Sequence, residues 1–288
     1  SAGEDGSGSF ILGAAGSLET TDSGSDITVT TGSTSGDITL TGTTTALDLV
    51  TMATASGSLN GSGLVTGDTV DLNASSGIGN TTGITLSSSN VTADTTTGDV
   101  EIANSLGTAV IVSSLTTGSG SVIFNQSGGG DLSTSTVSAS GAVALANAAG
   151  SLSLAGTVVS SSLDASASGA ITDGNDGDLT IAGLAEFTAG SVELGNDAGN
   201  ATNFGTFTFN SAGSVTISED SSLDLVGTNA ADSADLDSTA GVSDAGAVSV
   251  DVTGLLDVSG TSIALGSGTS VFNAGTLTFN SAGSVTVS

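Results

Sequence analysis

A five-residue motif recurs along the chain and limits what the chain can fold into. Each copy has Gly, a small or acidic residue, then two β-branched, Leu or Phe residues separated by one residue. This period-two alternation is typical of a short half-buried strand, and the leading Gly predicts a tight corner with positive φ. The copies begin at Gly36, Gly98, Gly120, Gly141, Gly150, Gly177, Gly190, Gly213, Gly246 and Gly283.

The copies recur at two periods. Gly98 and Gly120 are 22 residues apart, Gly120 and Gly141 are 21 apart, and others are less regular. Residues 205–218 and 275–288 match at 12 of 14 positions with an offset of 70. Because internal periods indicate repeat architectures, we interpret the longer unit as three turns of about 23 residues.

A strand-and-turn unit of this length cannot bury its own apolar face, whereas stacked copies can. The sequence therefore predicts an all-β solenoid of parallel strands, with coils of about 20–23 residues and about 13 coils. We expect one continuous array over residues 1–288, an excerpt of a longer chain, with the clearest repeats at 177–218 and 246–288. Tandem immunoglobulin-like β-sandwiches are the alternative fold, but they usually contain a buried Trp or Tyr and Pro-marked turns, and this chain has none of the three residues.

The charge is entirely negative, since the chain has 29 acidic residues and no Lys, Arg or His. Binding to nucleic acid or to anionic membrane surfaces needs cationic side chains, so both partners are excluded. The composition also excludes His-based acid–base catalysis, thiol nucleophiles and zinc sites of the His/Cys type. No apolar run is long enough for a membrane-spanning helix, so we expect no membrane insertion. A mean hydropathy of +0.33 and the absence of Pro favour a folded chain over a disordered one.

Most acidic residues lie beside predicted turns or at outward strand positions. We expect staggering, screening or bound cations to relieve repulsion between carboxylates in neighbouring coils. The outward acids of the motif copies are Asp37, Asp99, Glu101, Asp178, Glu193 and Asp251.

The densest acidic segment is a candidate calcium site. Asp173, Asn175, Asp176 and Asp178 offer the hard oxygen ligands that Ca²⁺ prefers, although the twelfth position of an EF-hand loop is Leu184 in place of Glu. The competing interpretation is a polar turn between coils. A second acidic segment, 229–237, lacks the strand motif, so we expect a surface loop there.

The Gly-Ser-Val-Thr-Ile type strands, the Ala-Gly-Ser turns and the Ser/Thr/Gly/Ala/Asn bias resemble the repeat regions of filamentous-haemagglutinin-like exoproteins. These are large bacterial adhesins secreted by two-partner or autotransporter routes. The resemblance covers most of the chain, most clearly residues 177–288. It implies a right-handed parallel β-helix displayed outside the cell as a stalk, fibre or adhesin.

These observations predict a non-enzymatic extracellular fibre or stalk of a cell-surface filament. Its expected partners are further copies or neighbouring repeats, and host or neighbouring cell-surface glycans are a second class. Calcium is the one expected cofactor, and we expect the Phe side chains to fill the core. The alternatives are a receptor-binding adhesin tip and a polysaccharide-acting β-helix enzyme, which would need two carboxylates about 5–10 Å apart in a groove.

Overall fold

A computed structural model describes residues 8–32 and 36–288, and all secondary structure in these residues is β. The chain is a parallel β-solenoid of about 12 turns with coils of about 21 residues, which confirms the predicted fold class. Every strand pair whose register is known is parallel, so the antiparallel β-sandwich alternative is wrong. Right-handedness of the coils stays a prediction.

The chain divides into two compact units, residues 1–149 and residues 150–288. The strands of the first unit are β1 (Phe10–Leu12), β2 (Ser17–Glu19), β3 (Ile27–Thr31), β4 (Ile38–Leu40), β5 (Thr43–Thr45), β6 (Leu49–Thr54), β7 (Leu59–Asn60), β8 (Leu64–Ala74), β9 (Ile84–Thr95), β10 (Val100–Asn104), β11 (Val110–Thr117), β12 (Val122–Gln126), β13 (Leu132–Ala139) and β14 (Ala142–Asn147).

The strands of the second unit are β15 (Leu152–Ser160), β16 (Ser162–Ala167), β17 (Ala170–Thr172), β18 (Asp178–Ala189), β19 (Ser191–Leu194), β20 (Thr202–Ser211), β21 (Ser214–Glu219), β22 (Leu223–Leu225), β23 (Thr228–Ala231), β24 (Ser233–Ser238), β25 (Gly241–Asp244), β26 (Ser249–Gly260), β27 (Ser262–Leu265), β28 (Val271–Ser281) and β29 (Val285–Val287).

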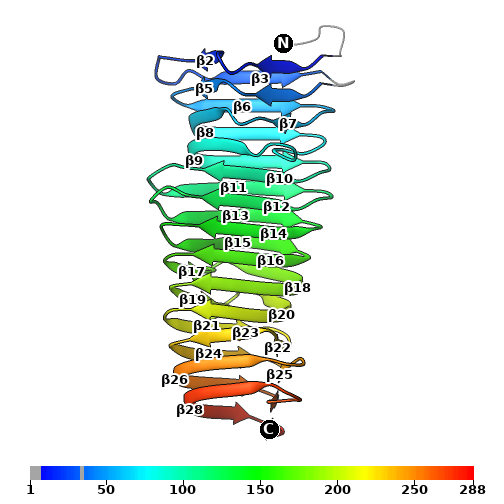
Figure 1. The fold of residues 1–288 in the computed structure, drawn as a ribbon, viewed down its shortest axis with the longest axis vertical. Helices are drawn as coiled ribbons and strands as arrows, with labels where there is room; N and C mark the ends of the chain where they lie inside the picture. The colour runs from blue at the N-terminus through cyan, green and yellow to red at the C-terminus, as the bar shows by residue number, and fades with distance from the viewer. Residues whose placement is uncertain (1–7, 33–35) are drawn as a thin grey trace. The chain divides into compact units, whose positions relative to one another are not determined.

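Within each unit, a strand pairs with the strand about one coil later (Figure 1). That partner is usually not the next strand in sequence, although β9 pairs with both β8 and β10. In the first unit one stack runs β3–β6–β8–β9–β11–β13, and β10–β12–β14 form another. In the second unit β17–β19–β21–β24 and β22–β25–β27–β29 are two of the stacks. All ten motif copies lead into strands, as the alternation predicts.

Alternate side chains of each strand face the interior, and most of these are Val, Ile, Leu or Ala. β10 shows the pattern, with Val100 and Ile102 buried and Glu101 exposed between them. In the second unit the interior contains a Phe cluster in which neighbouring ring centroids lie 5.5–5.8 Å apart. Its members are Phe187, Phe204, Phe207 and Phe209, so the predicted core role is confirmed for Phe204, Phe207 and Phe209. Phe272 and Phe279 were expected in the core too, but both are only half-buried on β28, so the prediction was wrong for them.

The motif glycines are required mainly by close contact between coils. Gly98 and Gly246 have φ of +80° and +85°, as predicted for corners. Gly141 and Gly213 do not have positive φ, but a Cβ at either would lie 2.6 Å from the carbonyl oxygen of the motif Gly one coil earlier. A side chain there would push neighbouring coils apart, so the explanation by φ alone was incomplete.

Candidate functional site

The acidic side chains mostly face outward and bind the coil that follows them. The six outward acids of the motif copies are all exposed, as predicted. Asp37 Oδ1 accepts the backbone N–H of Ser58 at 2.8 Å, and Asp99 Oδ1 accepts that of Ser121 at 2.8 Å. Asp94 Oδ1 accepts the hydroxyls of Ser114 and Thr116 at 2.7 and 2.5 Å.

We call an Asp that accepts a hydrogen bond from the next coil an inter-coil clip. The donor lies 19–26 residues after the Asp and is a backbone N–H, a Ser or Thr hydroxyl or, for Asp251, the side-chain amide of Asn273. Carboxylates therefore find neutral donors in a chain without cationic side chains, and charge-assisted hydrogen bonds are stronger than neutral ones. Further inter-coil clips are Asp26–Leu49, Asp68–Ser89, Asp178–Ala201, Asp224–Ser243, Asp232–Thr253 and Asp257–Thr278.

Most carboxylates in the strands pair in register with uncharged residues, as Glu101 does with Ile123, but some stand directly beside each other. Asp164 pairs in register with Glu186, and Asp235 pairs with Asp257. Burial raises the pKa of Asp235 above its usual value, and the negative charges of Asp237 and Asp257 raise it further. Ionised Asp235 is therefore unfavourable in the folded chain.

Three of the predicted calcium ligands lie in the turn between β17 and β18, Asp178 is the first residue of β18, and the four differ in burial. Asp173 is buried and its Oδ2 accepts the N–H of Gly195 at 2.5 Å, whereas Asn175 and Asp176 are exposed. Asp178 is exposed and its Oδ1 accepts the N–H of Ala201 at 3.0 Å. In residues 8–32 and 36–288 no three acidic side chains are arranged to hold a metal ion. Calcium binding by this turn stays a prediction.

Burial raises the pKa of Asp173, although the Gly195 N–H and the Asn200 side chain oppose the shift. The negative charge of Asp197 adds to it. Asp173 thus differs from the solvent-facing acids around it, and the recurring motif gives no sign of this because Asp173 lies outside the copy that begins at Gly177.

The second acidic segment is not the surface loop that we expected. It contains most of β23 and β24, in which Ala234 and Leu236 face inward and Asp235 outward. Asn229 is fully buried, and its Oδ1 accepts the N–H of Phe209 at 3.0 Å. The prediction was wrong because β24 keeps the period-two alternation without a leading Gly, and because the inward residues of β23 are Asn229 and Ala231 in place of large apolar ones.

Buried amides form a ladder that sequence analysis missed. Asn104, Gln126 and Asn147 occupy one register position in β10, β12 and β14, and all three are buried. Asn104 Oδ1 accepts the N–H of Ser88 and Asn104 Nδ2 donates to the carbonyl of Ser88, both at 3.0 Å. Each amide follows the last inward apolar residue by two positions, and this recurrence could have revealed the ladder.

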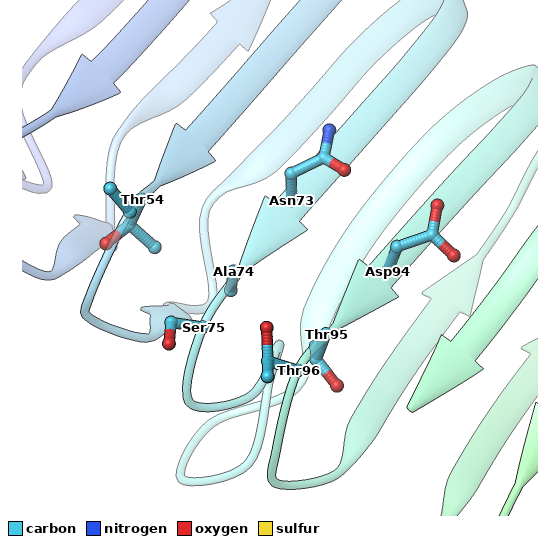
Figure 2. A pocket seen from close by; sticks show the side chains of 8 residues that line it. Thr54, Asn73, Ala74, Ser75, Asp94, Thr95 and Thr96 are labelled. Carbon is cyan, nitrogen blue, oxygen red and sulfur yellow. The ribbon is translucent and has the colours of Figure 1, made fainter. Parts of the chain in front are cut away.

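Grooves occur on the surface where strands end. One of about 320 Å³ follows β6, β8 and β9, and in Figure 2 Asn73 and Asp94 project from neighbouring strands while Ser75 and Thr96 lie in the turns. Another, of about 390 Å³, is lined by Asp37, hydroxyls and Asn60. Neither has the two carboxylates that glycoside hydrolysis uses.

A third groove, of about 310 Å³, includes Glu219, Asp220 and Asp237. Glu219 Oε1 accepts the N–H of Phe204 at 2.7 Å, and Asp220 Oδ2 accepts the N–H of Thr202 at 3.0 Å. Both acids therefore accept hydrogen bonds from the preceding coil, whereas the Asp of an inter-coil clip accepts them from the following coil. Burial raises the pKa of Glu219 to about 7, with a smaller contribution from the charge of Asp220, although its two hydrogen-bond donors oppose the shift.

Comparison with known proteins adds no relative, because no family model, no curated protein and no solved structure matches the chain. The described part of the chain has no helix that is long and apolar enough to cross a membrane.

Proposed function

We propose that this chain is a non-enzymatic structural segment of an extracellular fibre or stalk, of the kind its repeats resemble. The observation that carries the proposal is the coil-to-coil bonding within each unit. Backbone ladders on several sides of the coil are supplemented by inter-coil clips, so each coil is held both by its main chain and by its surface. Such a stack bears load without a specific ligand.

The surface chemistry supports a role in display. The outward acids, such as Glu101 and Glu193, give every part of the array the same sign of charge, which keeps separate arrays apart in solution. The absence of Lys and Arg removes all cleavage sites for trypsin-like proteases, which suits exposure outside a cell. The partners in this proposal are further repeats, joined through strand edges, and the coils are right-handed.

Electron microscopy of the native material tests the proposal. Filaments or stalks on the cell surface, labelled on intact cells by an antibody against residues 177–288, are the expected result. Isolated globules, or labelling only after the cells are opened, would contradict it.

The enzyme alternative is tested separately on acidic and neutral polysaccharides. Release of reducing ends by the wild-type chain that disappears in Asp237→Asn would favour a hydrolase, because Asp237 is the groove carboxylate not bound to the preceding coil. Binding of glycans without cleavage would favour an adhesin tip.

A further inference from the structure

We propose that the second unit holds a hard cation inside its coils, against Asn200, Thr202 and Glu219. This site shares Asp173 with the calcium turn that the sequence suggests, but it does not include the exposed Asn175, Asp176 and Asp178. It does not depend on the proposed fibre role.

Three side chains at this corner have a buried oxygen without a hydrogen-bond partner. They are Asn200 Oδ1, Thr202 Oγ1 and Glu219 Oε2, and the residues are 9%, 0% and 1% exposed. Buried polar atoms in folded proteins almost always have a partner. Three buried oxygens without a hydrogen-bond partner at one corner therefore indicate a bound partner that the protein's own side chains do not provide.

The backbone brings these residues together. Asn200 and Thr202 are two residues apart at the start of β20, and both are buried. Phe204, two residues further on, donates its N–H to the other oxygen of Glu219. Asp220 binds the N–H of Thr202, so the ends of β20 and β21 lie against each other.

Gly195 forms the wall of the same corner. A Cβ at Gly195 would lie 2.8 Å from Thr202 Oγ1 and 2.0 Å from the carbonyl oxygen of Ser218. Gly195 also has φ of +73°, which disfavours side chains. The position next to Thr202 and Glu219 is thus kept clear of a side chain.

The chemistry of the corner selects a cation rather than an anion or a neutral apolar group. Its lone atoms are all oxygens, and Asp173, also buried, adds a second carboxylate beside Asn200. The chain has no Lys, Arg or His to neutralise them, and an uncompensated buried charge is very unfavourable. Ca²⁺ binds carboxylate, amide and hydroxyl oxygens and completes its shell with carbonyls or water.

Calorimetric titration of the chelator-treated 288-residue chain with calcium tests the proposal. The wild-type chain should bind one equivalent of calcium that Glu219→Gln loses or binds more than about 100-fold more weakly, which exceeds the roughly 10–100-fold that loss of a residue behind a metal ligand causes. Thr202→Val, which keeps the shape and the charge, should weaken the same equivalent. Asp176→Asn, in the exposed turn, should retain it.

The proposal is overturned if the wild-type chain binds no calcium, or if Glu219→Gln binds as many equivalents with unchanged affinity. It is also overturned if Asp176→Asn loses the equivalent that Glu219→Gln keeps, because the ion then sits in the exposed turn. Circular dichroism confirms that each variant is folded, and if Glu219→Gln is not, Thr202→Val alone decides.

Discussion

The buried side-chain amide of Asn104 allows a test of how backbone N–H and C=O groups in the interior obtain their hydrogen bonds. The side chain and Ser88 are both fully buried, and the amide accepts the Ser88 N–H while donating to the Ser88 carbonyl. Asn104→Asp keeps the shape and the acceptor but replaces the donor by an oxygen. At pH 7 an ionised carboxylate would then face a buried carbonyl.

We expect Asn104→Asp to lower the free energy of unfolding by about 3–5 kcal/mol at pH 7, the usual cost of an uncompensated buried charge. Burial raises the pKa of the new carboxyl group, so its contribution to stability is lost as the pH rises through that raised pKa. At pH 4 the protonated acid can again donate to Ser88, and the loss relative to wild type should fall to about 1 kcal/mol.

Urea unfolding followed by circular dichroism at pH 7 and pH 4 measures both differences, and hydrogen exchange reports the Ser88 amide directly. Asn125→Asp is the matched control, because Asn125 is exposed on β12 and should change stability by less than about 0.5 kcal/mol. Equal losses in Asn104→Asp at the two pH values, or equal losses in both variants, would refute the bridging role.

Three further predictions concern the core and the surface. Phe209→Ala should destabilise its coils by about 3–5 kcal/mol, measured by native-state hydrogen exchange, because the ring is 1% exposed; protection equal to wild type would contradict this. Asp94→Ala should lower the free energy of unfolding, measured by urea denaturation, by about 1–2 kcal/mol through loss of the hydrogen bonds from two hydroxyls, whereas Asp176→Ala should not. Asp235→Asn should raise the melting temperature at pH 7. The pKa of Asp235 is raised in the folded chain, so folding stability is lost as the pH rises and this carboxyl group ionises beside Asp257. The difference in melting temperature between Asp235→Asn and wild type should vanish near pH 3.

The apolar alternation was sufficient to predict the fold class and the coil length. Each motif copy, such as Gly98-Asp-Val-Glu-Ile102, predicts a strand and its inward-facing residues, because burial of one face of a strand imposes alternation of apolar and polar residues. The spacing between copies predicts the coil length. The loop prediction for residues 229–237 failed where a strand started without Gly.

The polar interior could not be predicted from composition. Asn104 and Glu219 occupy inward positions that an apolar residue normally fills, and their partners, Ser88 and Phe204, lie on other coils. Pairing across coils depends on the register of each strand, and the irregular spacing of the motif leaves that register open. Whether Asp173 and Asp178 face inward or outward depends on the same strand register, so it could not be predicted either.

The inter-coil clips have a consequence for how such a chain can change its length during evolution. Each carboxylate requires a donor about one coil later, so a short insertion between Asp99 and Ser121 would separate the pair and shift the strand register. Duplication or deletion of a whole coil puts an equivalent donor back in place. Gene lineages encoding such arrays should therefore vary in steps of whole coils. The near-identical segments 205–218 and 275–288 do not differ by three coils, because the register leads from Val215 through Ala234 and Leu256 to Leu277 and not to Val285, so the interpretation of the 70-residue unit as three turns was wrong.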